Sequence, residues 1–229
     1  MKTTAIIVAA GSGSRLDPET PKQFLILDGR PVLAHTLERF QSAPSIDSIV
    51  LVLATNRVAE FEQKFDKVIK IVAGGPTRAA SVLNGLNAVD SESAIVAVHD
   101  GARPFVSVDE IERTVAIAKE TGAACLVGSV TDTIKTIRGD EISGTLDRDK
   151  LRRALTPQVF RSELLRRAFE LGGTGEAVTD ECYLVEKLGH PIALVEGSSR
   201  NIKITHPEDL KLGEVFLQQD RNGFEKISE

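Results

Sequence analysis

A glycine-rich segment near the start of the chain carries the residues best suited to chemistry. It reads Ala9-Ala10-Gly11-Ser12-Gly13-Ser14-Arg15, ends an apolar stretch, and is followed by Lys22. Glycine lets a backbone approach a ligand closely, and successive N–H groups can form an anion-binding nest. The pattern predicts a phosphate-binding loop with two cations, Arg15 and Lys22. The simpler alternative is a pair of solvated surface cations.

Two common phosphate-binding motifs do not fit this loop. A P-loop requires Gly, four residues and then Gly-Lys-Ser/Thr, and the loop has no such run. A dinucleotide-binding fingerprint requires a small residue where Leu16 stands and immediate entry into a helix, which Pro18 and Pro21 interrupt. No acidic residue at Ala54-Thr55, after the second expected strand, is placed to hold a ribose. The loop therefore indicates neither a P-loop NTPase nor a dinucleotide-dependent oxidoreductase.

The elements that must hold this loop alternate between short apolar runs and amphipathic stretches. Continuous apolar runs favour strands covered on both faces, and the alternating order implies parallel strands with right-handed crossovers. We expect strands at 3–10, 49–53, 69–72, 94–98, 123–130, 192–195 and 201–204. We expect helices at 31–42, 57–65, 78–89, 162–169, 180–187 and 207–218, and one that begins at Ser107 with Glu110 in a capping box. The predicted fold class is α/β, with a Rossmann-like, mainly parallel twisted sheet and helices on both faces.

Residues 131–153 interrupt this alternation, because they are polar, charged and contain two glycines. Two short β-like stretches, 133–137 and 142–145, flank Arg138-Gly139-Asp140-Glu141. We predict a β-hairpin arm that projects from a single domain spanning 1–229. The alternative is a mobile surface loop.

The composition is that of an ordinary globular protein of 229 residues with a formal net charge of −5. This charge argues against a broad nucleic-acid surface. Cys125 and Cys182 are far apart in the sequence and form neither a disulfide framework nor a zinc pattern. No apolar stretch approaches membrane-spanning length, and the residues after Met1 do not form a signal peptide. We therefore expect a cytoplasmic protein that binds neither nucleic acid nor membrane.

Several segments, taken in order along the chain, resemble one known family. The loop 9–15, with Pro21-Lys22-Gln23 behind it, is similar to the signature loop of the sugar-phosphate nucleotidyltransferases. The other segments that carry the resemblance are Gly74-Gly75 with Arg78 and Ser81, His99-Asp100-Gly101-Ala102-Arg103-Pro104-Phe105, Ala154-Leu155-Thr156-Pro157-Gln158, Thr179-Asp180-Glu181 and Asn201-Ile202-Lys203-Ile204-Thr205. Together they cover almost the whole chain and resemble the 2-C-methyl-D-erythritol 4-phosphate cytidylyltransferase family.

The resemblance implies an enzyme that couples CTP to 2-C-methyl-D-erythritol 4-phosphate in the non-mevalonate isoprenoid pathway. The products would be 4-diphosphocytidyl-2-C-methyl-D-erythritol and pyrophosphate. Arg15 and Lys22 are implied as catalytic groups on the phosphates of CTP. The positions implied in CTP binding are Ala9, Ala10, Gly11, Gly75, Ser81, Asp100 and Gly101. A triphosphate would need Mg²⁺, for which Asp100 is the expected ligand, the alternative being an ion pair with Arg103.

The resemblance also implies a separate site for the polyol phosphate. Arg148 and Lys203 would hold its phosphate group, with hydroxyl partners at Thr133, Thr156 and Thr179. Arg148 and Thr133 lie on the predicted arm, which in the family reaches into the partner subunit. The resemblance therefore implies a homodimer with shared active sites.

Three other functions stay open from the sequence alone. A ribitol-5-phosphate cytidylyltransferase would share the fold, the nucleotide and most of the loop. A non-catalytic CTP-binding module would leave Arg148 and Lys203 without a role. An interaction protein would explain the arm but not the glycine-rich loop.

Overall fold

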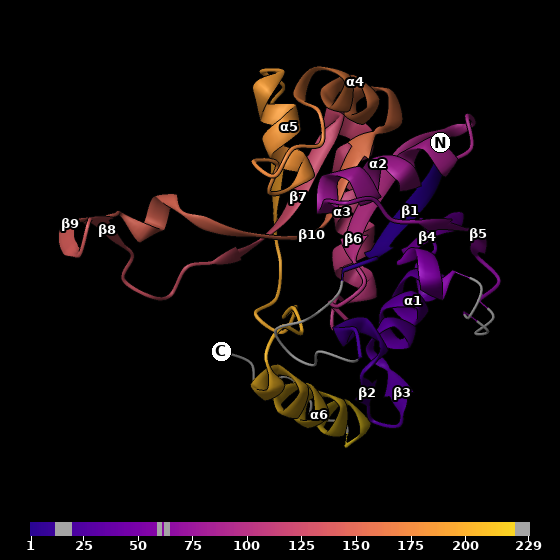
Figure 1. Ribbon diagram of the computed structural model, residues 1–229, viewed down its shortest axis with the longest axis horizontal. Coiled ribbons are helices and arrows are strands. Elements are labelled where there is room, and N and C mark those ends of the chain that lie inside the picture. The colour runs from indigo at the N-terminus through magenta and orange to yellow at the C-terminus, as the bar shows by residue number, and fades with distance from the viewer. Residues whose placement is uncertain (12–19, 59–60, 62–64, 223–229) are drawn as a thin grey trace.

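Seven strands form the central sheet of the computed structural model, which describes residues 1–11, 20–58, 61 and 65–222 (Figure 1). Across the sheet the order is β11-β7-β10-β6-β1-β4-β5. The strands are β1 (Lys2–Ala9), β4 (Ser48–Leu53), β5 (Val68–Ala73), β6 (Ser93–Asp100), β7 (Ala123–Ser129), β10 (Arg152–Arg161) and β11 (Ala193–Glu196). All but β10 coincide with predicted apolar runs, because strands covered on both faces need apolar side chains on both.

The strand order reverses at β1. From β1 the chain adds β4 and then β5 on one side, and it returns to place β6 on the other side, all parallel. Ligands of open α/β sheets bind beyond the carboxyl ends of the strands at such a reversal. β10 runs antiparallel to both of its neighbours, β6 and β7, so the sheet is mainly parallel, as predicted.

Helices cover both faces of the sheet. They are α1 (Val32–Ser42), α2 (Arg78–Ala88), α3 (Val108–Thr121), α4 (Ser162–Gly172), α5 (Glu181–Lys187) and α6 (Pro207–Arg221). Helices α1 and α3 bury side chains such as Phe40 and Ile111 in one core, and α2, α4 and α5 bury others such as Leu86 and Phe169 in a second. In the described part of the chain, no helix is both long and apolar enough to cross a membrane.

The predicted capping box begins α3. The Ser107 hydroxyl accepts a hydrogen bond from the Glu110 N–H at 3.1 Å, and Glu110 Oε2 accepts one from the Ser107 N–H at 2.7 Å. These bonds satisfy two donors that a helix start leaves without partners. The helix ends at Gly122, whose φ of 92° is a left-handed conformation that glycine adopts without strain.

A small third core ties the segments around the β1–β6 crevice to the C-terminal helix. The 3-10 helix η1 (Lys22–Phe24) leads into a short hairpin of β2 (Ile26–Leu27) and β3 (Arg30–Pro31). Leu27, Phe105 and Ile204 are buried together, and residues of α6 such as Phe216 pack against them. Because Leu27, Phe105 and Ile204 follow Lys22, Asp100 and Lys203 along the chain, α6 fixes these three site segments relative to one another.

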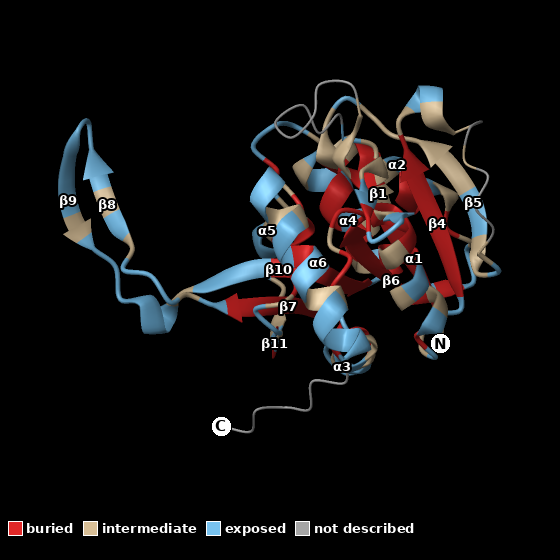
Figure 2. Cartoon of the chain, turned by 90° about the horizontal axis from the view of Figure 1, so that it is seen from below, coloured by how far each residue is buried: buried red, intermediate tan, exposed pale blue. Residues whose placement is uncertain are grey.

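The predicted hairpin arm is confirmed. β8 (Lys135–Arg138) and β9 (Glu141–Thr145) pair antiparallel, with Ile137 opposite Ile142, and a 3-10 helix η3 (Arg148–Lys150) leads back to β10. The arm extends away from the body (Figure 1) and is almost entirely exposed (Figure 2). Ile137 is 74% exposed and Ile142 69%. Within this chain the arm therefore has no hydrophobic core of its own.

Three element predictions were wrong. In the range 57–65, the structure describes residues 57, 58, 61 and 65, of which only Arg57 is helical, in the 3-10 helix η2 (Thr55–Arg57). Residues 201–204 are not a strand. Of their N–H groups only that of Ile204 bonds to a distant segment, at the Ala102 carbonyl, 2.8 Å away. Strand β10 was missed, because Pro157 and the buried polar Thr156 and Gln158 conceal its pattern, and its register with β7 shifts there.

Candidate active site

A cleft of about 480 Å³ opens at the carboxyl ends of β1 and β6, where the strand order reverses. It brings together most of the residues that the sequence assigned to substrates. Those that line it are Ala9, Ala10, Gly11, Lys22, Gly75, Ser81, Asp100 and Lys203. Residues 8–11, 22–23, 75–78, 81, 100, 102 and 203 therefore converge on one cleft.

The glycine-rich loop is held to β1 at both of its described ends. The side chain of Gln23 is buried, and its amide donates to the carbonyls of Ala9 at 2.6 Å and Gly11 at 3.0 Å. This tie brings Lys22 to the cleft wall beside Gly11. Arg15 lies outside the described residues, so its assignment to the nucleotide phosphates stays a prediction.

The wall opposite the loop is the turn that enters α2. The Thr77 hydroxyl caps the helix by accepting from the Ala80 N–H at 3.0 Å. The Ser81 hydroxyl accepts from the Gly75 N–H at 3.0 Å and donates to the Thr77 carbonyl at 2.9 Å. A Cβ at Gly75 would lie 2.6 Å from the Cβ of Ala80, so only glycine fits this turn. Ser81 therefore shapes the turn that lines the cleft, in addition to any contact with a base.

Asp100 is the centre of charge in the cleft. Its Oδ1 accepts from Arg78 Nε at 3.1 Å, and its Oδ2 accepts from Lys203 Nζ at 2.8 Å. Arg103 Nε lies 3.5 Å from Oδ2. The ion pair with Arg103, which the sequence left as an alternative role for Asp100, is therefore present together with two others.

These contacts set the ionisation of Asp100. Burial by itself would raise the pKa of Asp100, but Arg78, Lys203 and Arg103 together hold it well below the ordinary value of 3.8. The carboxylate is therefore fully ionised at neutral pH. Burial lowers the pKa of Arg78, and the charges of Asp100 and Glu181 more than compensate, so the guanidinium stays charged.

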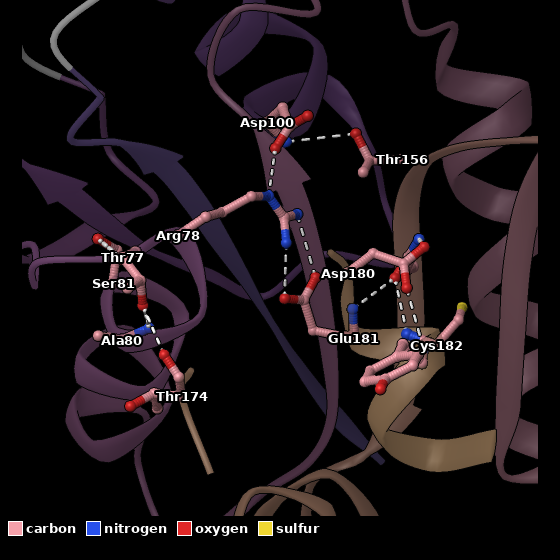
Figure 3. A network of polar contacts seen from close by, with 12 residues as sticks. Thr77, Arg78, Ala80, Ser81, Asp100, Thr156, Thr174, Asp180, Glu181 and Cys182 are labelled. Carbon is pink, nitrogen blue, oxygen red and sulfur yellow. Dashed lines mark hydrogen bonds and ion pairs between the residues drawn. The ribbon is translucent and has the colours of Figure 1, made fainter. Parts of the chain in front are cut away.

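A second carboxylate stands behind Arg78. Glu181 accepts two hydrogen bonds, from Arg78 Nη1 at 2.8 Å and from Nη2 at 3.1 Å, as Figure 3 shows. Its side chain is fully buried. Burial raises its pKa, and the adjacent guanidinium of Arg78 opposes that rise. The two-point contact is the geometry of an ionised carboxylate facing a guanidinium fork.

His99 lies beneath Asp100, outside the cleft lining. Its Nδ1 lies 3.0 Å from the Thr156 hydroxyl, and its Nε2 lies 3.1 Å from the Arg103 carbonyl. The Thr156 hydroxyl also accepts from the Asp100 N–H at 3.2 Å. Complete burial lowers the pKa of His99 to about 4, so the ring is neutral at pH 7. The pair Thr156 and His99 therefore supports the backbone at Asp100.

Several predicted site residues do not reach this cleft. Thr133 and Arg148 are exposed on or beside the arm, where Arg148 Nη1 donates to the Thr131 carbonyl at 2.6 Å. Thr179 is exposed just before α5. Gly101 lies one residue beyond Asp100 and is buried, and a Cβ there would meet the Cβ of Ala9 at 2.8 Å. Its contribution is close packing of the β6 end against β1.

Sequence reasoning gave no individual role to four residues that organise the site. They are Gln23, Arg78, Gln158 and Glu181. Each lies inside a recognisable motif, but its partner is far away in the sequence: Arg78 and Glu181 are 103 residues apart. A signal for such a pair exists only in the fold or in covariation between related sequences.

The acid groups near the cleft do not form a protein-made metal cage. In the described ranges, no group of three or more His, Cys, Asp and Glu side chains could hold a metal ion. Mg²⁺ commonly uses one or two carboxylates together with phosphate oxygens and water. A single ionised carboxylate, Asp100, in a cleft that Lys22 also lines, fits that mode of binding.

Comparison with known proteins identifies the family. The profile of the family described as IspD, 2-C-methyl-D-erythritol 4-phosphate cytidylyltransferase, matches residues 3–219. The chain belongs to this family. Its activity is that of a cytidylyltransferase in the non-mevalonate isoprenoid pathway.

Individual family members match over nearly their full length. The 2-C-methyl-D-erythritol 4-phosphate cytidylyltransferases of Geotalea uraniireducens and Clostridium novyi are 41% and 44% identical, and each alignment covers 95% of this chain and 97% of the relative. The 4-diphosphocytidyl-2C-methyl-D-erythritol synthase of Anaerococcus prevotii superposes with a TM-score of 0.83 at 33% identity, covering 95% of this chain and 98% of that one. The Francisella tularensis cytidylyltransferase superposes with a TM-score of 0.80 at 33% identity, covering 94% and 99%. These matches favour the methylerythritol branch over the ribitol alternative.

Proposed function

We propose that the cleft holds CTP and 2-C-methyl-D-erythritol 4-phosphate side by side and transfers the cytidylyl group between them. The observation that most supports this assignment is the convergence of residues 9–11, Lys22, the α2 turn, Asp100 and Lys203 on one cleft. An oxygen of the polyol phosphate attacks the α-phosphorus of CTP. The bond from that phosphorus to the bridging oxygen breaks, and pyrophosphate leaves.

The protein's task in this reaction is positioning and charge stabilisation. A phosphate monoester is already a competent nucleophile at pH 7, so no side chain has to activate it. The obstacle is repulsion between two anions. We assign Lys22 and Arg15 to the phosphates of CTP, where they stabilise charge that builds up on the α-phosphate in the transition state. Gly75 and Ser81 border the pocket assigned to cytosine.

The cofactor in this proposal is Mg²⁺. Asp100 would hold it by one carboxylate, and the remaining ligands would be phosphate oxygens of CTP and water. When bound, the ion would neutralise phosphate charge during displacement. Lys203 Nζ lies 2.8 Å from Asp100 Oδ2 and lines the cleft, and we assign it to the phosphate of the polyol.

The arm supports a homodimer in which each subunit completes the other's active site. An isolated two-stranded hairpin is marginally stable in water, and this one exposes Ile137 and Ile142 at paired positions. Neither Thr133 nor Arg148 is among the residues that line the cleft of its own chain. We therefore place these two residues at the polyol phosphate of the partner's cleft, with Thr179 and the buried Thr156 supplied by the subunit that owns the cleft.

Two broader assignments accompany this function. We propose that residues 1–229 form one nucleotidyltransferase domain, with the arm 131–153 as part of it. The reason is that the central sheet contains both the first strand, β1, and the last, β11. We also propose a cytoplasmic location, which agrees with two cysteines, Cys125 and Cys182, that are free thiols.

The test is release of pyrophosphate from CTP and Mg²⁺ by the purified protein. Release with 2-C-methyl-D-erythritol 4-phosphate, and none with ribitol 5-phosphate, is the expected result. Release with ribitol 5-phosphate alone would move the substrate assignment to the other branch. Binding of CTP without release of pyrophosphate from either substrate would contradict the catalytic assignment.

A further inference from the structure

Glu181 does not line the cleft, yet it contacts a residue that does. Its two oxygens take both terminal nitrogens of Arg78, at 2.8 and 3.1 Å, and the remaining nitrogen, Nε, donates to Asp100 Oδ1 at 3.1 Å. The Arg78 guanidinium thus lies between two carboxylates (Figure 3), of which Asp100 lines the cleft and Glu181 does not. Each carboxylate uses a different edge of the same planar group.

The position of Glu181 is itself fixed by the central sheet. Gln158 of β10 accepts from the backbone N–H groups of Glu181 and Cys182, both at 3.1 Å, and its amide donates to Asp180 Oδ2 at 2.9 Å. Asp180 caps α5 by accepting from the Tyr183 N–H at 2.9 Å. The first turn of α5 is therefore fastened to the strand that also carries Thr156, the support of Asp100 from below.

This arrangement has a consequence for the charge at the cleft. A guanidinium with one carboxylate partner tends to take both of its oxygens in a fork, which would turn Asp100 away from any other ligand. Glu181 occupies the end of the guanidinium formed by Nη1 and Nη2, and Asp100 accepts a single hydrogen bond from the side, from Nε. One oxygen of Asp100 therefore faces Arg78 while the other faces Lys203 Nζ at 2.8 Å.

Stability alone is a poor explanation for Glu181. A fully buried carboxylate is costly to desolvate, and a buried ion pair is often no more stable than well-packed apolar residues. The pair does, however, specify a single orientation of a charged group at the edge of a reaction site. Fixed orientation is the contribution that transfer between two bound anions requires.

We propose that Glu181 is a positioning residue for cytidylyl transfer, acting through Arg78 to hold the Asp100 carboxylate in its orientation. This inference rests on the proposed role of Asp100 and Lys203 at the substrates. It predicts that loss of Glu181 impairs the chemical step more than it impairs binding of CTP, because the base-binding turn at Gly75 and Ser81 is left intact.

The first test is Glu181→Gln, which keeps the shape but presents an N–H to the guanidinium in place of one oxygen. We expect kcat to fall by about 10- to 100-fold, because a displaced positioning group typically costs that much. The Kd for CTP with Mg²⁺, from calorimetry, should change by less than about threefold, since contacts equal in ground and transition states are kept. Glu186→Gln, an exposed residue of the same helix, is the matched control and should match the wild type in both measurements.

The second test asks whether Glu181 acts through Arg78. If it does, Arg78→Gln with Glu181→Gln should lose no more than about threefold in kcat relative to Arg78→Gln alone, because coupled residues are non-additive. Glu181→Asp keeps the charge but is one methylene shorter, so its kcat should lie between those of Glu181→Gln and the wild type. It carries the kinetic test if Glu181→Gln does not fold, which circular dichroism would reveal.

Three results would overturn the inference. They are wild-type kcat in folded Glu181→Gln, a loss carried wholly by the Kd for CTP, and full additivity with Arg78→Gln. A wild-type protein that releases no pyrophosphate would instead contradict the proposed function. The two failures are therefore distinguishable in one set of assays.

Discussion

The cleft and the arm of this protein are built on opposite principles. The cleft is tied together within one chain: Gln23 holds the loop, Ser81 holds the α2 turn, and Asp100 has three cationic partners. The arm has a two-stranded ladder, with Ile137 and Ile142 more than two-thirds exposed. The cleft is thus assembled within one chain, whereas the arm has no hydrophobic packing in its own chain, which is the basis for proposing that it packs against a partner subunit.

Removal of Lys22 should break the cleft without affecting the arm. Lys22→Ala should lower kcat by about 10²–10³, the usual cost of deleting one donor to a transition-state charge. Pyrophosphate release measures the loss, and size-exclusion chromatography should show an unchanged oligomeric state. Lys211→Ala, an exposed lysine of α6, is the control and should retain full activity. Equal activity in the two variants would contradict the assignment of Lys22.

Acid should weaken the support of the cleft through His99. The pKa of His99 is about 4 in the folded protein and 6.5 ordinarily, so folding favours the neutral ring. Its contribution to the free energy of unfolding is complete above pH 6.5 and is lost as the pH falls towards 4, by about 3 kcal/mol in all. Asp100 stays ionised in this window, because its pKa lies well below 3.8.

Urea unfolding at several values between pH 7 and pH 4 measures this slope. His99→Asn should flatten it, because the titrating group is gone. His190→Asn, which changes a half-buried histidine near Thr121, should leave it as in the wild type. Identical slopes in all three proteins would show that His99 does not carry the effect.

Charge on the arm should separate the subunits. Ile137→Asp with Ile142→Asp would bury two carboxylates if the arm packs against a partner, and we expect the Kd of the dimer to rise by about tenfold or more. Analytical ultracentrifugation measures that constant. The control is Leu171→Asp, at a leucine on α4 that is 72% exposed, and it should leave assembly unchanged. An arm variant that dimerises like the wild type would contradict the proposed interface.

Loss of a helix cap should have the smallest effect. Thr77→Ala removes the hydroxyl that caps α2 and that donates to the Thr174 carbonyl at 2.9 Å, and it should cost about 1–2 kcal/mol of unfolding free energy. Urea denaturation measures the change, and Thr77→Ser should recover most of it. A Ser variant as unstable as the Ala variant would assign the effect to the lost methyl group.

Local patterns in the sequence predicted the sheet, most helices and the arm. The capping box at Ser107, for example, is a local signal, and it begins α3 as predicted. β10 was missed because a proline and buried polar side chains replace the apolar run that marks its neighbours. The helix expected at 57–65 is wrong in the residues described there, of which only Arg57 is helical, because amphipathic spacing is a weak signal over so short a stretch.

For the site, the motifs named eight of the residues that line the cleft, whose roles toward the substrates stay predictions, but they did not predict how these residues are connected. Lys203 and Asp100 were each assigned to a ligand, and the sequence did not predict the ion pair that joins them at 2.8 Å. Glu181 lay in a recognised motif without a role, because its partner Arg78 is 103 residues away. Motifs can name residues of one site, whereas the hydrogen bonds between those residues follow only from packing.

The most direct test of the shared site is complementation between two inactive variants. Lys22→Ala disables the owner's side of the cleft, and Arg148→Ala disables the arm. After subunit exchange in an equal mixture, half of the dimers would contain one subunit of each variant. Each such dimer would have one intact site of two, so activity should recover to about a quarter of the wild-type value. Activity that stays at the level of the separate variants would contradict a cleft completed by the partner's arm.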